Sequence, residues 1–129
     1  MTLLKGKKGL VVGIANERSL AWGIANSIHQ HGGELALTYQ NDALKKRIVP
    51  LATKVNSNNI YEFDIQNYEK IPSFFENLSQ DFGNLDFIVH AVAFSDKEEL
   101  KGDYVDTTKN NFFSFYFFWF IFILFLLVV

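Results

Sequence analysis

Residues 9–23 read GLVVGIANERSLAWG, a short apolar run that stops at Gly13 and gives way to a helical pattern near Ser19. Such a run is typical of a buried strand, and the turn after it begins a helix. A glycine at the strand end would let the backbone approach a pyrophosphate, and the helix would direct its free N–H groups at that anion. The spacing Gly-x5-Ser-x3-Gly differs from the usual G-x-G-x-x-G, so glycines that serve only a tight turn stay an alternative.

The strand and helix patterns recur about every 25 residues along the chain. This alternation predicts right-handed crossovers and a parallel sheet with helices on both faces. The expected strands are residues 9–13, 34–39, 60–64 and 85–94, and the expected helices are residues 19–31, 42–51 and 67–82. The sequence therefore predicts an α/β protein, namely the N-terminal, nucleotide-binding half of a Rossmann-type fold.

Four local expectations follow from these patterns. Leu20, Ile24 and Ile28 lie on one apolar helical stripe beside Ala21 and Ala25, which predicts a helix that packs on the sheet. Gly23 would allow the first helix to pack closely on the sheet. Asp42 is the expected N-cap of the second helix. The strand at 85–94 is nearly all apolar, which predicts burial on both of its faces.

The composition excludes several classes of protein and of site. The chain has 129 residues, enough for one domain, and a net charge of −2 that argues against a dedicated nucleic-acid binder. It contains no cysteine, which excludes disulfides, thiolate metal sites and cysteine nucleophiles. The N-terminus lacks the apolar region of a signal peptide. We therefore expect a cytoplasmic protein without a metal site.

Residues 112–129 read FFSFYFFWFIFILFLLVV and are apolar or aromatic everywhere except at Ser114. The expected division is thus a half-domain at 1–111 and an apolar tail at 112–129. Three interpretations of the tail stay open. The first is an aberrant end of a truncated gene, which the small range of residue types in the tail favours. The second is a buried or aggregation-prone segment. The third is a membrane anchor, because a helix of 18 residues is about 27 Å long, close to the ~30 Å thickness of the hydrocarbon core.

Several motifs resemble the bacterial enoyl-acyl-carrier-protein reductases of the short-chain dehydrogenase superfamily. The resemblance covers residues 2 to about 110 and rests on the turn at 13–23, ELALTYQND at 34–42, Asp64-Ile65, and the segments 90–94 and 100–105. It implies reduction by NADH of the trans-2 double bond of an enoyl chain carried on acyl carrier protein, a step of fatty-acid biosynthesis. It also implies a homotetramer for the intact protein.

The resemblance further implies cofactor contacts at the ends of the expected strands. By matching position these are Gly13, Ser19 and Leu20 at the pyrophosphate, Gln40 at the adenosine ribose, Asp64 and Ile65 around the adenine, and Val92 beside the nicotinamide ribose. Asp64 would accept a hydrogen bond from the adenine amino group. Ser95 falls where the family contacts substrate.

Gln40 stands where dinucleotide folds usually place an acidic residue for the ribose 2′-hydroxyl. Its amide can bind a hydroxyl, whereas a 2′-phosphate would favour a cation closer than Lys45 or Lys46. The sequence therefore predicts NADH as the preferred cofactor over NADPH. His90, inside the last expected strand, is expected to be a hydrogen-bonded core residue and not a catalyst.

The catalytic pair that the resemblance leads one to expect is missing. Short-chain dehydrogenases use a tyrosine and, seven residues later on the same helix, a lysine. Only Tyr39 has a lysine at that spacing, Lys46, and these two straddle a strand end and a helix. We therefore expect no catalytic residue and a truncated chain that is inactive alone. A non-catalytic nucleotide-binding or membrane-tethered module and another short-chain dehydrogenase stay as alternatives, although residues 103–105 favour the enoyl reductases.

Overall fold

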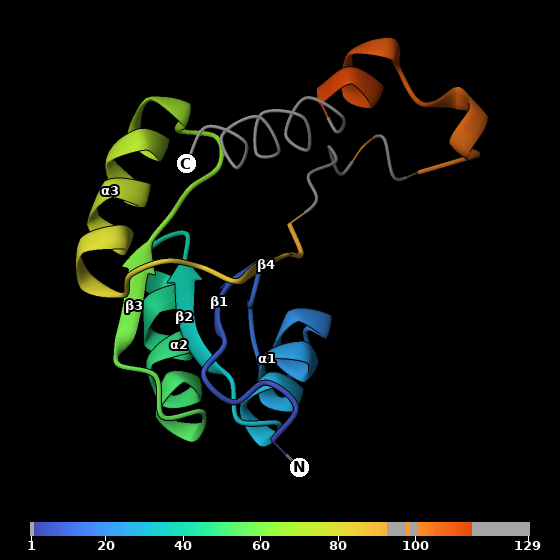
Figure 1. Ribbon diagram of the computed structural model, residues 1–129. Helices are drawn as coiled ribbons and strands as arrows, with labels where there is room; N and C mark the ends of the chain where they lie inside the picture. The colour runs from blue at the N-terminus through green and yellow to red at the C-terminus, as the bar shows by residue number, and fades with distance from the viewer. Residues whose placement is uncertain (1, 93–97, 99–100, 115–129) are drawn as a thin grey trace. The chain divides into compact units, whose positions relative to one another are not determined.

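The computed structural model describes residues 2–92, 98 and 101–114 (Figure 1). The chain divides into two compact units, Met1–Asp64 with Ser73–Val92, and Ile65–Pro72 with Ala93–Val129. Along the chain the strands and helices are β1 (Lys8–Val12), α1 (Leu20–Gln30), β2 (Glu34–Tyr39), α2 (Asp42–Lys54), β3 (Asn59–Glu62), α3 (Ile71–Asp81) and β4 (Phe87–His90). Short 3-10 turns lie at Tyr68–Lys70 and Tyr104–Asp106, and residues 109–114 are helical.

The four strands form one parallel sheet in the order β3-β2-β1-β4 (Figure 1). In register, Gly9 of β1 lies opposite Leu35 of β2 on one side and Phe87 of β4 on the other. The chain moves from β1 outward to β2 and β3, and then returns to the opposite side of β1 for β4. This arrangement confirms the predicted Rossmann-type α/β fold, and it places a reversal of strand order at β1.

Helices cover both faces of the sheet. On one face, Val11 and Leu37 belong to a buried cluster with residues of α1 and α2, namely Ala21, Ala25, Ile28, Ile48, Leu51 and Ala52. Strand side chains alternate between faces, so Tyr61, opposite Thr38, lies on the other face. There the Tyr61 ring meets Phe74 of α3 edge-on, with ring centroids 6.0 Å apart.

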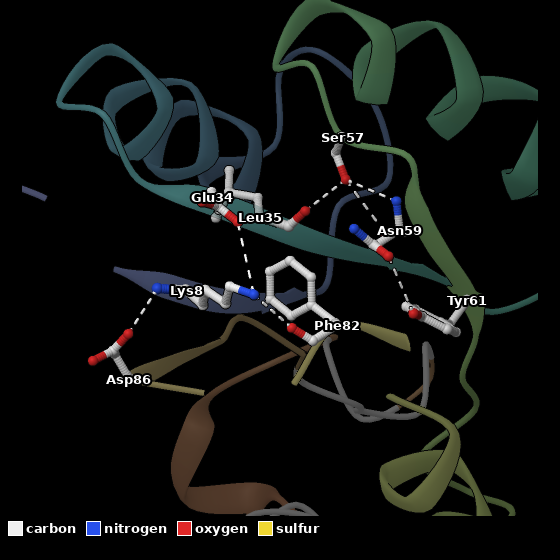
Figure 2. A network of polar contacts seen from close by, with 8 residues as sticks. All are labelled: Lys8, Glu34, Leu35, Ser57, Asn59, Tyr61, Phe82 and Asp86. Atoms are coloured by element: carbon white, nitrogen blue, oxygen red, sulfur yellow. Dashed lines mark hydrogen bonds and ion pairs between the residues drawn. The ribbon is translucent and has the colours of Figure 1, made fainter. Parts of the chain in front are cut away.

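Polar contacts fasten the amino ends of the strands (Figure 2). The Lys8 ammonium donates to the Phe82 carbonyl at 2.8 Å, and the Lys8 backbone N–H donates to the Asp86 carboxylate at 2.8 Å. The buried Ser57 hydroxyl donates to the Leu35 carbonyl at 2.6 Å. Since parallel sheets bind ligands at the carboxyl ends of their strands, these contacts at the amino ends serve the fold.

The predicted apolar stripe of α1 is buried only in part, because Ile28 faces the sheet while Leu20 and Ile24 do not. The helix buries Ala21, Ala25 and Ile28, whereas Leu20 is 86% and Ile24 is 43% exposed. The small alanine side chains let the helix backbone lie close to the sheet. The helix therefore faces the sheet with its alanines, and the larger Leu20 and Ile24 face solvent.

Three further local predictions are corrected. A Cβ added at Gly23 would meet open space, so this glycine does not serve close packing. The N-cap of α2 is Asn41, whose side chain accepts from the Leu44 N–H at 3.0 Å, because Asn41 has extended backbone while Asp42 already lies in the first turn. Strand β4 is shorter than predicted and half-buried, since among the described strands it pairs only with β1.

Candidate functional site

The carboxyl ends of β1 and β4 lie side by side where the strand order reverses. Open parallel sheets bind ligands outside the carboxyl ends of their strands at such a reversal. Gly13 follows β1 directly, and Ala91 and Val92 follow β4. The Ala91 N–H donates to the Val12 carbonyl at 2.8 Å, so the pairing continues past the strands. Two predicted site residues, Gly13 and the half-buried Val92, are thereby brought to this edge.

Gly13 has a backbone conformation that requires glycine. Its φ is +114°, a value that residues with a side chain rarely adopt. A Cβ added there would overlap the carbonyl group of Ala91. The close approach of the two strand ends therefore depends on this glycine.

The turn between β1 and α1 is organised by Asn16. The Asn16 side-chain oxygen accepts from the Arg18 backbone N–H at 2.8 Å, and the Asn16 carbonyl accepts from the Ser19 hydroxyl at 2.7 Å. Ser19 is the N-cap of α1, but its hydroxyl supports the turn and not the helix. The first turn of α1, which begins with the exposed Leu20, has no acidic residue. Because the first N–H groups of a helix lack intrahelical partners, this end suits an anion.

Gln40 and Asp64, two residues predicted at the adenosine end, touch each other. The Gln40 side-chain amide donates to an Asp64 carboxylate oxygen at 3.3 Å. The backbone bond from the Phe63 N–H to the Tyr39 carbonyl, 2.8 Å long, holds the ends of β2 and β3 together just before these residues. The family resemblance implies that Gln40 and Asp64 lie near one nucleoside, and the register of the two strands makes them direct neighbours.

The structure does not bring Ile65 and Ser95 together with the other predicted site residues. Ile65 is only 6% exposed and belongs to the second unit, so its position is described by its burial alone. Ser95, predicted at the substrate, lies outside the described residues. In the part of the chain that the structure describes, no three His, Asp or Glu side chains gather as metal ligands would.

The sequence did not reveal two contacts near this edge. The Lys45 ammonium lies 5.4 Å from the centroid of the Tyr39 ring. The Lys54 ammonium pairs with the Glu17 carboxylate of the turn after β1, and this pairing lowers the pKa of Glu17. An aromatic residue at a strand end followed by a lysine in the next helix is the only signal that would have suggested the first contact.

His90 ends β4 and is half-buried. Burial lowers its pKa from the ordinary value of 6.5, and a backbone hydrogen bond offsets part of this effect. Because the unfolded chain then binds the proton more tightly, the free energy of unfolding should fall as the pH drops below about 7 toward the folded pKa. His90→Gln should flatten that slope in urea unfolding measured across this window. An unchanged slope would contradict the account.

The chain is similar to enoyl-acyl-carrier-protein reductases in both sequence and structure. A family model described as enoyl-(acyl carrier protein) reductase matches residues 13–116. Enoyl-[acyl-carrier-protein] reductase [NADH] 2 of Rhizobium meliloti is 49% identical over 110 residues, which are 85% of this chain and 41% of the relative. The crystal structure of the Anaplasma phagocytophilum enoyl reductase in complex with NAD matches with a TM-score of 0.81 and 47% identity, over 88% of this chain and 44% of that one.

A third relative was crystallised with a different cofactor. The Bacillus cereus enoyl-acyl carrier protein reductase, solved with NADP+ and indole naphthyridinone, matches with a TM-score of 0.81 and 36% identity, over 89% of this chain and 46% of that one. The chain thus spans about two fifths of the length of the relatives that it matches. Because the family model covers most of the chain, the chain belongs to the enoyl-acyl-carrier-protein reductase family.

Proposed function

We propose that this chain forms the NADH-binding part of an enoyl-acyl-carrier-protein reductase, with the cofactor along the carboxyl edge of the sheet. One observation supports the proposal above all others. Gly13, Gln40 and Asp64 come from distant parts of the sequence, yet they stand just beyond the carboxyl ends of three neighbouring strands. This is the edge at which parallel sheets bind nucleotides.

The residues at this edge suit the parts of a dinucleotide. The pyrophosphate would lie at Gly13, Ser19 and Leu20, where the N-terminus of α1 favours an anion. Gln40 donates to Asp64 and keeps its own amide oxygen for a ribose hydroxyl. Asp64 retains acceptor capacity for the adenine amino group. Donors at the helix N-terminus are thus proposed for the anionic pyrophosphate, and acceptors on Gln40 and Asp64 for the hydroxyl and amino groups that donate.

The family resemblance implies three further contacts, namely Ile65 with the adenine, Val92 with the nicotinamide ribose and Ser95 with the substrate. Bound NADH supplies the hydride, while the chain's own residues bind and orient it. The preference for NADH over NADPH rests on the neutral Gln40 amide and on the Asp64 carboxylate that it contacts, which repels a 2′-phosphate.

Enoyl reduction on acyl carrier protein is a proposal for the whole protein. In the structure Tyr39 ends β2 and Lys46 lies in α2, so this spacing match does not form a pair on one helix. We expect this chain to bind NADH but to oxidise it with a crotonyl thioester more than about 100-fold slower than the full-length Rhizobium relative assayed beside it. Turnover near the relative's rate would overturn the proposal that catalysis needs further residues, and absence of NADH binding would overturn the cofactor site.

For the intact protein we further propose a homotetramer in the cytoplasm. Analytical ultracentrifugation of a full-length relative and of this chain would test whether assembly needs the rest of the family's length. A monomeric relative would overturn the proposed tetramer.

The division at residue 112 supports a second candidate, a nucleotide-binding module held at a membrane by the apolar tail. Among the described residues no helix is long and apolar enough to cross a membrane, and most of 112–129 lies outside them. If the tail is an anchor, the full chain should enter the detergent phase of a Triton X-114 partition, and a chain ending at 111 should stay in the aqueous phase. Equal partition of both would exclude the anchor.

A further inference from the structure

We infer that Lys54 is a positioning residue for the cofactor, because its pairing with Glu17 offsets a carboxylate in the turn at which the pyrophosphate is proposed to bind. The inference rests on the cofactor site proposed above and adds a residue to it. Glu17 lies in the turn between β1 and α1, just before Ser19, the N-cap of α1. Lys54 is the last residue of α2, and its ammonium donates to the Glu17 carboxylate.

The other polar contacts described for this turn stay within it or run into α1. The Asn16 side chain accepts from the Arg18 N–H, and the Asn16 carbonyl accepts from both the hydroxyl and the backbone N–H of Ser19. The Ser19 carbonyl in turn accepts from N–H groups in the first turn of α1. These contacts give the turn its shape. The pair with Lys54 connects the turn to a separate helix, and it holds the Glu17 carboxylate toward α2.

The charges of the turn explain why this pairing bears on an anion. Between Gly13 and Leu20 the chain carries two charged side chains, Glu17 and Arg18. Without a partner, the Glu17 carboxylate would cancel the positive charge of Arg18 and would repel a pyrophosphate. Lys54 neutralises Glu17 and so leaves the turn with the positive charge of Arg18. That charge adds to the attraction of the α1 N-terminus for an anion.

The pair is ionised at neutral pH and exposed to solvent. The hydrogen bond from Lys54 and its charge lower the pKa of Glu17, so the carboxylate keeps its negative charge. The side chains of Lys54 and Glu17 are 55% and 62% exposed. Exposed ion pairs contribute little to stability, and salt screens the repulsion between exposed charges. Loss of Lys54 should therefore change the affinity for the cofactor in a salt-dependent way and leave the stability of the fold nearly unchanged.

Fluorescence titration of the full chain with NADH, at low and at high salt, tests this role. Relative to the parent at the same salt, Lys54→Gln should weaken NADH binding about fivefold at ~10 mM salt and less than about twofold at ~1 M. The double variant Glu17→Gln/Lys54→Gln should bind within about twofold of the parent at both, because it also lacks the repelling carboxylate. Arg47→Gln removes the same charge from an exposed position of α2 and should leave the affinity unchanged.

Urea unfolding of the same variants separates positioning from a structural role. The urea midpoint of Lys54→Gln should match that of the parent, whereas a structural role would lower the midpoint and the affinity together. Full NADH affinity of Lys54→Gln at low salt, or a loss of affinity that persists in the double variant, would overturn the role of Lys54. Failure of the parent chain to bind NADH at all would instead overturn the proposed cofactor site, and the inference with it.

Discussion

Gly13→Val is expected to abolish NADH binding and to destabilise the fold by about 2–3 kcal/mol. The φ of +114° at this position is a conformation that a β-branched residue adopts only with strain, and the first added carbon would already overlap the Ala91 carbonyl. Relief of that overlap would separate the ends of β1 and β4 and displace the turn at which the pyrophosphate is proposed to bind. NADH fluorescence titration and urea unfolding of the same preparation measure the two effects.

Gly23→Ala is the matched control, because both glycines belong to the stretch that suggested nucleotide binding. A Cβ at position 23 meets open space, and alanine is a better helix former than glycine. This variant should gain about 0.5–1 kcal/mol of stability and keep the parent affinity for NADH. If both variants lost binding equally, the two glycines would share a role that the structure does not give them.

Leu37→Ala is expected to cost about 3 kcal/mol of unfolding free energy, the larger of the stability effects. Leu37 lies in the second strand of the sheet, opposite Val11 of β1, and is fully buried in the cluster that joins the sheet to α1 and α2. Truncation there leaves a cavity that neighbouring strands and helices on that face cannot close. Urea denaturation followed by circular dichroism gives the midpoint and the slope.

Leu3→Ala supplies the comparison for this prediction. Leu3 is 77% exposed, so its removal should change the unfolding free energy by no more than about 0.5 kcal/mol. Similar losses in the two variants would mean that the cluster around Leu37 does not hold the fold together.

The order of elements could be predicted from the sequence because a regular period fixes a parallel sheet almost by itself. The orientation of α1 could not. Leu20, Ile24 and Ile28 have the spacing of one apolar stripe, but only Ile28 of these three is buried, together with Ala21 and Ala25. The small alanines let the backbone approach the sheet closely, and tertiary packing decided which face is buried. Likewise Asn41 and Asp42 can both cap a helix, and the choice depends on where the strand ends.

In the candidate site, too, some features could be predicted from the sequence and others could not. The roles of Gly13 and of the N-terminus of α1 could be predicted, because a strand–turn–helix pattern is visible in the sequence. The contact between Gln40 and Asp64 depends on the register of β2 and β3, which periodicity does not set. The contact between the Lys45 ammonium and the Tyr39 ring depends on side-chain rotamers and on the start of α2 directly after the strand. No sequence motif predicts either of these features.

Amide hydrogen exchange with and without NADH tests the central claim most directly, because it reports where on the sheet the cofactor binds. The account predicts that NADH slows exchange at residues 13–21 and 40–41, at the carboxyl edge. It predicts no change around Lys8, Glu34 and Ser57, whose contacts fasten the amino ends of the strands. Slowed exchange at the amino ends, or none at the carboxyl edge while NADH is bound, would contradict the account.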